Sequence, residues 1–180
     1  MGCPVPTAAG RGRGAGLIPE IEFVDRLLNE VLPQISSKLS IKTRIGLDDE
    51  GQLLKMIEVL NGYPLHEVII HPRTASQKYG GQINHPMFSE ACHLLKHQVV
   101  YSGDIFTEQD FRRIKQLHPQ INRWMLGRGV LRDPLLMDKI KGGGSAKKSD
   151  MLVFLNDLKS LYSQRDLSEH IILKRLKALL

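Results

Sequence analysis

The chain has 180 residues, of which 42% are hydrophobic and 24% charged, as expected for a globular protein with its own core. Its formal net charge of +6 favours an anionic partner, and nucleic acid is the first candidate. No apolar run approaches the ~20 residues of a membrane span, and the two cysteines form neither a disulfide framework nor a zinc-binding pattern. We therefore expect a cytoplasmic protein without a metal site or a membrane contact.

The first sixteen residues combine Gly2-Cys3-Pro4 with an alternation of glycine and arginine from Gly10 to Gly14. Composition alone favours a disordered basic tail. The alternative is a loop whose arginines hold phosphate groups and whose glycines let a ligand approach closely. The residues themselves leave both interpretations open.

Helices are predicted where apolar residues recur at helical spacing, and strands where short β-branched runs occur. The predicted helices span residues 19–31, 50–60, 87–96, 107–117 and 134–140. The predicted strands span residues 39–46, 68–70, 98–104 and 123–129. Because strands and helices alternate, we expect an α/β fold with a parallel sheet.

The C-terminal part has a different character. Residues 142–148 are rich in glycine and predict a linker between a first region, 1–141, and a helical region, 149–180. The last predicted helix carries Lys174, Arg175 and Lys177, which suit either RNA binding or a solvated face.

The strand at 39–46 alternates so that Lys42 and Arg44 share one face. Two cations on one face of an interior strand are costly unless they meet an anion or another polar ligand. An exposed edge strand with solvated charges is the alternative.

Polar residues follow the apolar run Val68–Ile70 at once. They include His71, Arg73, Thr74, Gln77 and Tyr79, and Gly80-Gly81 close the segment. In parallel α/β folds ligands bind at the carboxyl ends of strands, so we expect a loop here that forms part of a site.

Two glycine-containing turns follow the last two predicted strands. They are Ser102-Gly103-Asp104 and Gly127-Arg128-Gly129. Backbone N–H groups of such turns, with the Arg128 guanidinium, suit a phosphate group. Successive turns of this kind hold phosphate in (β/α)8 barrels, and we expect the same here.

Taken together, these motifs resemble those of tRNA-dihydrouridine synthases. The resemblance runs in order through Gly2-Cys3-Pro4, residues 42–46, residues 70–81, residues 102–105 and residues 127–129. It implies about the second half of a (β/α)8 TIM barrel, followed by short C-terminal helices that bind tRNA.

The resemblance also implies chemistry. Such enzymes use FMN, reduced by NADPH, to pass hydride to C6 of a uracil in tRNA, while a cysteine protonates C5. Cys3 matches that cysteine, and Lys42 and His71 match residues that contact the flavin. The cofactor-binding turns correspond to Ser102, Gly103, Asp104, Gly127 and Arg128. The substrate-binding residues correspond to Arg73, Thr74, Gln77 and Tyr79.

Members of this family carry about half a barrel before the Gly-Cys-Pro motif, whereas this chain begins there. We therefore expect a fragment, an isoform or a product that has lost its first half. Such a chain should bind FMN poorly and self-associate through unpaired strand edges. A non-catalytic remnant or RNA-binding module is the alternative to an active enzyme.

Overall fold

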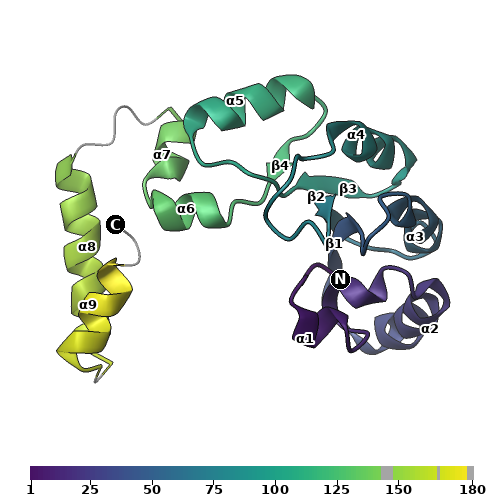
Figure 1. Ribbon diagram of the computed structural model, residues 1–180, viewed down its shortest axis with the longest axis horizontal. Helices are drawn as coiled ribbons and strands as arrows, with labels where there is room; N and C mark the ends of the chain where they lie inside the picture. Colours follow the sequence, from purple (N-terminus) through teal and green to yellow (C-terminus); the bar gives the residue numbers. More distant parts are fainter. Residues whose placement is uncertain (143–147, 166, 178–180) are drawn as a thin grey trace. The chain divides into compact units, whose positions relative to one another are not determined.

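The computed structural model describes residues 1–142, 148–165 and 167–177 (Figure 1). The chain divides into two compact units. Unit 1 comprises residues 1–103 and 118–125, and unit 2 comprises residues 104–117 and 126–180. Residues 143–147 of the predicted linker lie outside the described part. None of the described helices is long and apolar enough to cross a membrane.

Unit 1 is built on a sheet of four parallel strands in the order β1-β2-β3-β4. The strands are β1 (Ser40–Gly46), β2 (Glu67–Thr74), β3 (Gln98–Tyr101) and β4 (Arg123–Trp124). This arrangement confirms the predicted α/β class and is consistent with part of a (β/α)8 barrel.

The helices alternate with the strands, as the sequence predicts. Unit 1 contains α1 (Pro6–Ala9), η1 (Gly14–Leu17), α2 (Ile21–Val31), η2 (Leu32–Gln34), α3 (Gln52–Leu60) and α4 (His85–Leu94). Unit 2 contains α5 (Glu108–Leu117), α6 (Arg128–Arg132), α7 (Leu136–Ile140), α8 (Lys148–Ser163) and α9 (Glu169–Lys177).

Helix α4 shows how local sequence produces the packing. Asn84 caps its first turn by accepting a hydrogen bond of 2.8 Å from the backbone N–H of Met87. The fully buried Phe88 ring then meets the Tyr101 ring of β3 edge-on, with centroids 5.0 Å apart. The sheet face that carries Tyr101 is therefore the face that α4 covers.

A histidine completes this apolar contact. The sequence predicts that His85 and His118 are surface or cap residues. His118 directly follows the last residue of α5, but it is only 1% exposed and packs against Phe88. Its Nε2 lies 2.9 Å from Nδ1 of His85. Burial and the neighbouring His85 lower the pKa of His118, so the neutral ring is favoured.

Strand β2 is longer than predicted. His71 and Arg73 lie inside the strand and are buried, rather than in the loop that follows it. The prediction was wrong because parallel pairing with β1 continues past the apolar run, with Arg44 opposite His71. The register then shifts between Arg44 and Gly46.

The last strand, predicted at residues 123–129, is by contrast shorter than expected. Strand β4 ends at Trp124, and the Gly127-Arg128-Gly129 turn leads into helix α6. A side chain at Gly129 would collide with the carbonyl of Ile105, so the chain passes close to its neighbour here.

The sequence predicts that Thr107 caps α5 with Asp110 three residues on, and that Phe111, Ile114 and Leu117 form the buried stripe of this helix. The predicted cap is confirmed. The Asp110 carboxylate accepts from the N–H of Thr107 at 3.1 Å, and the Thr107 hydroxyl accepts from the N–H of Asp110 at 3.0 Å. The buried stripe is only partly as expected. Ile114 is buried, whereas Leu117 is 52% exposed.

Candidate active site

Strand register places three cation-forming side chains of unit 1 on one face of the sheet. Arg44 of β1 lies opposite His71 of β2, and Lys42 lies two residues before Arg44. Thr43, Ile70 and Tyr101 are aligned across the other face, which α4 covers. Lys42, Arg44 and His71 therefore occupy the face that would line the inside of a barrel.

Arg44 finds polar partners within the protein. It is 3% exposed, and its Nε donates to the carbonyl of Gly2 at 3.1 Å and its Nη1 to that of Thr74 at 2.6 Å. The polar ligand that a buried cation on this strand requires is thus the backbone of two other segments.

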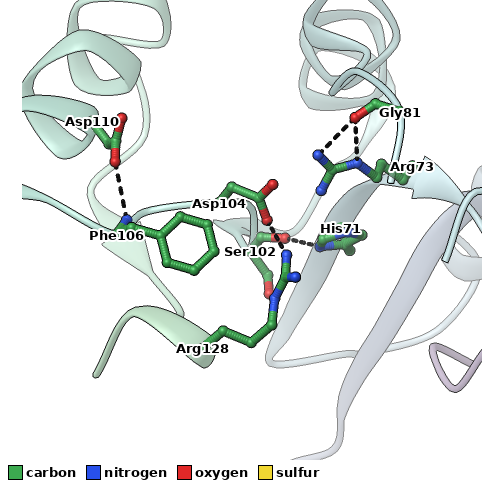
Figure 2. A network of polar contacts seen from close by, with 8 residues as sticks. All are labelled: His71, Arg73, Gly81, Ser102, Asp104, Phe106, Asp110 and Arg128. Atoms are coloured by element: carbon green, nitrogen blue, oxygen red, sulfur yellow. Dashed lines mark hydrogen bonds and ion pairs between the residues drawn. The ribbon is translucent and has the colours of Figure 1, made fainter. Parts of the chain in front are cut away.

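His71 is held in one tautomer. Its Nδ1 lies 2.5 Å from the carbonyl oxygen of Ser102 (Figure 2). A carbonyl only accepts, so Nδ1 carries the proton and Nε2 presents a lone pair. Nε2 is buried and has no hydrogen-bond partner among the residues that the structure describes.

The charge state of His71 follows from its surroundings. Burial lowers its pKa to about 4, and the nearby Arg44, Lys42 and Arg73 charges act in the same direction. The bond to Ser102 opposes this effect only in part. At neutral pH the ring is therefore uncharged and Nε2 is an acceptor.

Lys42 keeps an exposed side chain, but its surroundings are not those of bulk water. Partial desolvation lowers its pKa from 10.5, and the adjacent Arg44 charge adds to the effect. An ammonium in such a place gains energy from an electron-rich group that approaches it.

The loop that follows β2, residues 75–81, is held to the end of that strand by polar contacts. The Arg73 guanidinium donates to the carbonyl of Gly81 from Nη2 at 3.0 Å and from Nε at 3.3 Å (Figure 2). Gln77 accepts from the N–H of Thr74 at 2.8 Å. Arg73 and Thr74 are buried, whereas Tyr79 is 57% exposed and lies 5.7 Å from the Arg44 guanidinium.

Cys3 is exposed, and the first sixteen residues fold around it. The N–H of Ala15 donates to the carbonyl of Cys3 at 3.0 Å. Ala15 and Ile18 are fully buried and pack with Ala75. The expectation of a disordered tail is wrong, because this small apolar cluster is formed with a distant residue that composition does not reveal.

Gly14 lies against Cys3, a contact that the sequence motifs did not predict. Its φ is 55°, and a Cβ at this position would lie 2.8 Å from the carbonyl oxygen of Cys3 and 2.9 Å from its Cβ. Only glycine avoids both the backbone strain and the overlap. The alternation of glycine and arginine was the signal that could have found it.

In unit 2 the turn residues form an ion pair. Nη2 of Arg128 lies 2.5 Å from a carboxylate oxygen of Asp104 (Figure 2), and its guanidinium lies 5.3 Å from the Phe106 ring centroid. Arg128 is 41% exposed. The position at Gly127 is open, because a Cβ added there would meet none of the described atoms within 4 Å.

Comparisons with known proteins agree with this arrangement. The family model described as dihydrouridine synthase matches residues 1–166. The chain belongs to the dihydrouridine synthase family. It is 32% identical over 143 residues to the probable tRNA-dihydrouridine synthase of Helicobacter pylori strain 26695, covering 78% of this chain and 43% of that protein.

Two further relatives of this dihydrouridine synthase family member carry a more specific name, tRNA-dihydrouridine(16) synthase. The Haemophilus influenzae protein is 30% identical over 144 residues, covering 78% of this chain and 46% of its own length. The Ralstonia nicotianae protein is 24% identical over 152 residues, covering 83% and 46%. The chain thus spans about half the length of the curated relatives it matches.

No cluster of three or more potential metal ligands occurs among His, Cys, Asp and Glu in residues 1–142, 148–165 and 167–177.

Proposed function

We propose that the protein containing this chain is cytoplasmic and reduces uridine to 5,6-dihydrouridine in tRNA, with FMN as cofactor and NADPH as reductant. Family membership supports the reaction class. The observation that carries the proposal is the buried, unpartnered Nε2 of His71, on the same sheet face as the partly desolvated Lys42.

These two residues fit a flavin. Nε2 of neutral His71 needs a donor, and FMN offers hydroxyl groups and a ring N–H. The Lys42 ammonium suits the N1–C2 carbonyl side of the ring, where reduction places negative charge. When bound, FMN supplies the hydride for the uracil ring.

Cys3 is proposed as the proton donor. Its exposed thiol can reach a base that has left its stack. The thiol proton would pass from Sγ to C5 of the uracil. Arg44 and Gly14 hold the backbone that carries Cys3 and are proposed as positioning residues.

Arg128 is proposed to bind the FMN phosphate, with the open position at Gly127 beside it. Asp104 carries a carboxylate, which repels phosphate. We therefore propose that Asp104 orients the Arg128 guanidinium through their ion pair. Ser102 and Gly103 contribute from the end of β3, where the Ser102 carbonyl fixes the His71 tautomer.

For RNA we propose Tyr79 as the direct contact of the 75–81 loop, since its exposed ring can stack on a base. Arg73, Thr74 and Gln77 shape that loop through the contacts described above. The helical region 149–180 is proposed as a second RNA contact, through cations such as Lys174 and Arg175.

The test uses the purified protein that contains this chain, NADPH and tRNA transcribed without modification. FMN binding is followed by quenching of its fluorescence, up to millimolar cofactor, and dihydrouridine by mass spectrometry of digested tRNA. Cys3→Ala should abolish product and leave FMN affinity unchanged. Cys92→Ala is the matched control, because Cys92 is half-buried on α4 and burial raises its pKa to about 11.

Product formation that survives Cys3→Ala would remove Cys3 from the reaction. Binding of tRNA without any FMN binding or product would favour the alternative function, a non-catalytic RNA-binding module.

A further inference from the structure

Arg11 and Arg13 have no role in the site described above. Both side chains are exposed, and within the part of the chain that the structure describes neither guanidinium forms an ion pair or a hydrogen bond. Residues 1–19 contain these two cations and no Asp or Glu. The segment itself therefore carries positive side chains and no negative one.

The loop that carries the two arginines is fixed by backbone contacts. The N–H groups of Arg11 and Arg13 donate to the carbonyl of Ala8 at 3.1 and 3.0 Å. Gly12, between them, has a φ of 64°, which glycine adopts without strain. The guanidinium groups thus extend from a defined turn. Because folding already orders the backbone of this turn, a ligand that binds there does not have to order it.

This turn, which we call the arginine turn (residues 10–14), is joined directly to the reactive cysteine. Gly14, the residue after Arg13, lies against the backbone and Cβ of Cys3, and Ala15 donates to the Cys3 carbonyl. Arg13, the residue before Gly14, therefore stands one residue from the backbone contact with Cys3.

We propose that Arg11 and Arg13 bind backbone phosphates of the RNA next to the nucleotide presented to Cys3. This inference rests on the proposed function, which makes RNA the ligand at Cys3. A guanidinium matches a phosphate in shape and charge and forms paired hydrogen bonds with it. Gly12, between the two arginines, leaves room for a nucleic acid backbone to approach, because a Cβ added there would meet none of the described atoms within 4 Å.

This role differs from general attraction of RNA by a basic protein. Phosphate contacts fix the register of a nucleic acid, and a pair of contacts beside the thiol would hold the target nucleotide in place. Cations elsewhere on the surface would raise affinity without setting the position of the base at Cys3.

The test compares two double variants that each remove two positive charges from exposed residues of unit 1. Arg11→Gln with Arg13→Gln removes the arginine turn's charge. Arg26→Gln with Lys38→Gln is the matched control, since both residues are exposed. Binding of unmodified tRNA is measured between 50 and 200 mM salt, and circular dichroism checks that each variant is folded.

A plot of log affinity against log salt concentration has a negative slope. Loss of two phosphate contacts should make that slope less steep by about 1.4 to 1.8. Over this salt range the wild type should lose about tenfold more affinity than the arginine variant. The control should keep a slope close to that of the wild type. Equal slopes in all three proteins, or an equal fall in both variants, would overturn the inference, as would a chain that does not bind tRNA.

Alkylation of Cys3, followed by peptide mass spectrometry, gives a second readout. At an RNA concentration that half-protects Cys3 in the wild type, protection should be lost in the arginine variant and kept in the control. Protection that is equal in all proteins would contradict the inference. Neither readout needs FMN or dihydrouridine, so an Arg-dependent slope without product would refute only the proposed function.

Discussion

Acidification should destabilise the protein through His71. The folded ring has a pKa of about 4, whereas an unfolded histidine has about 6.5. Above pH 6.5 both states are neutral and His71 makes no difference to stability. As the pH falls below 6.5 the unfolded chain takes up a proton that the folded ring refuses, so stability falls until about pH 4.

The size of this effect follows from the two pKa values. Each pH unit in that window removes about 1.4 kcal/mol from the free energy of unfolding, which gives about 2 kcal/mol at pH 5 and about 3 kcal/mol in total. Urea unfolding of the wild type and of His71→Gln between pH 4.5 and 7.5 measures it. Because His118 also has a lowered pKa and is present in both proteins, its contribution cancels in the comparison.

Nuclear magnetic resonance of the imidazole nitrogens supplies the structural check. The expected spectrum is that of a neutral ring protonated on Nδ1 at pH 6. Two results would refute the reasoning. One is a ring that is protonated at pH 6, and the other is a proton on Nε2, because either would remove the acceptor proposed for the flavin.

Three further changes test other parts of the site. Gly14→Ala should lower the free energy of unfolding by roughly 1–2 kcal/mol in urea, because alanine resists a φ of 55°; unchanged stability would show that the turn adapts. Arg128→Ala should weaken FMN binding about tenfold in a fluorescence titration, and adding Asp104→Asn should recover part of it by removing a bare carboxylate. Lys174→Glu with Arg175→Glu should lower the salt slope of tRNA binding by about 1.4 or more; an unchanged slope would make that surface of α9 a solvated face.

The alternation of strands and helices could be predicted because the spacing of apolar residues along the sequence differs between the two. The run Val68–Ile70 identifies a buried strand, but nothing local shows that the strand continues through His71 and Arg73. Their partners are the carbonyls of Ser102 and Gly81, which stand 31 and 8 residues away along the chain. Polar residues satisfied by distant backbone look like a loop when only their neighbours are considered.

The prediction of a strand that runs to the Gly127-Arg128-Gly129 turn was wrong for a related reason. Glycine and arginine after an apolar run indicate a strand that ends in a turn, yet the turn begins α6. The close approach of Gly129 to Ile105 decides the path of the chain, and Ile105 lies in a different loop. Neither the helical nor the strand periodicity of a sequence shows which loops pack against each other.

Arg44 has a consequence for how unit 1 opens. One guanidinium joins the carbonyl of Gly2, the residue before Cys3, to the carbonyl of Thr74, the last residue before the 75–81 loop. Neither segment can leave the sheet without stripping hydrogen bonds from a buried cation, so both face the same energetic barrier to local unfolding. The two loops should therefore behave as one cooperative unit, with slow amide hydrogens that exchange together.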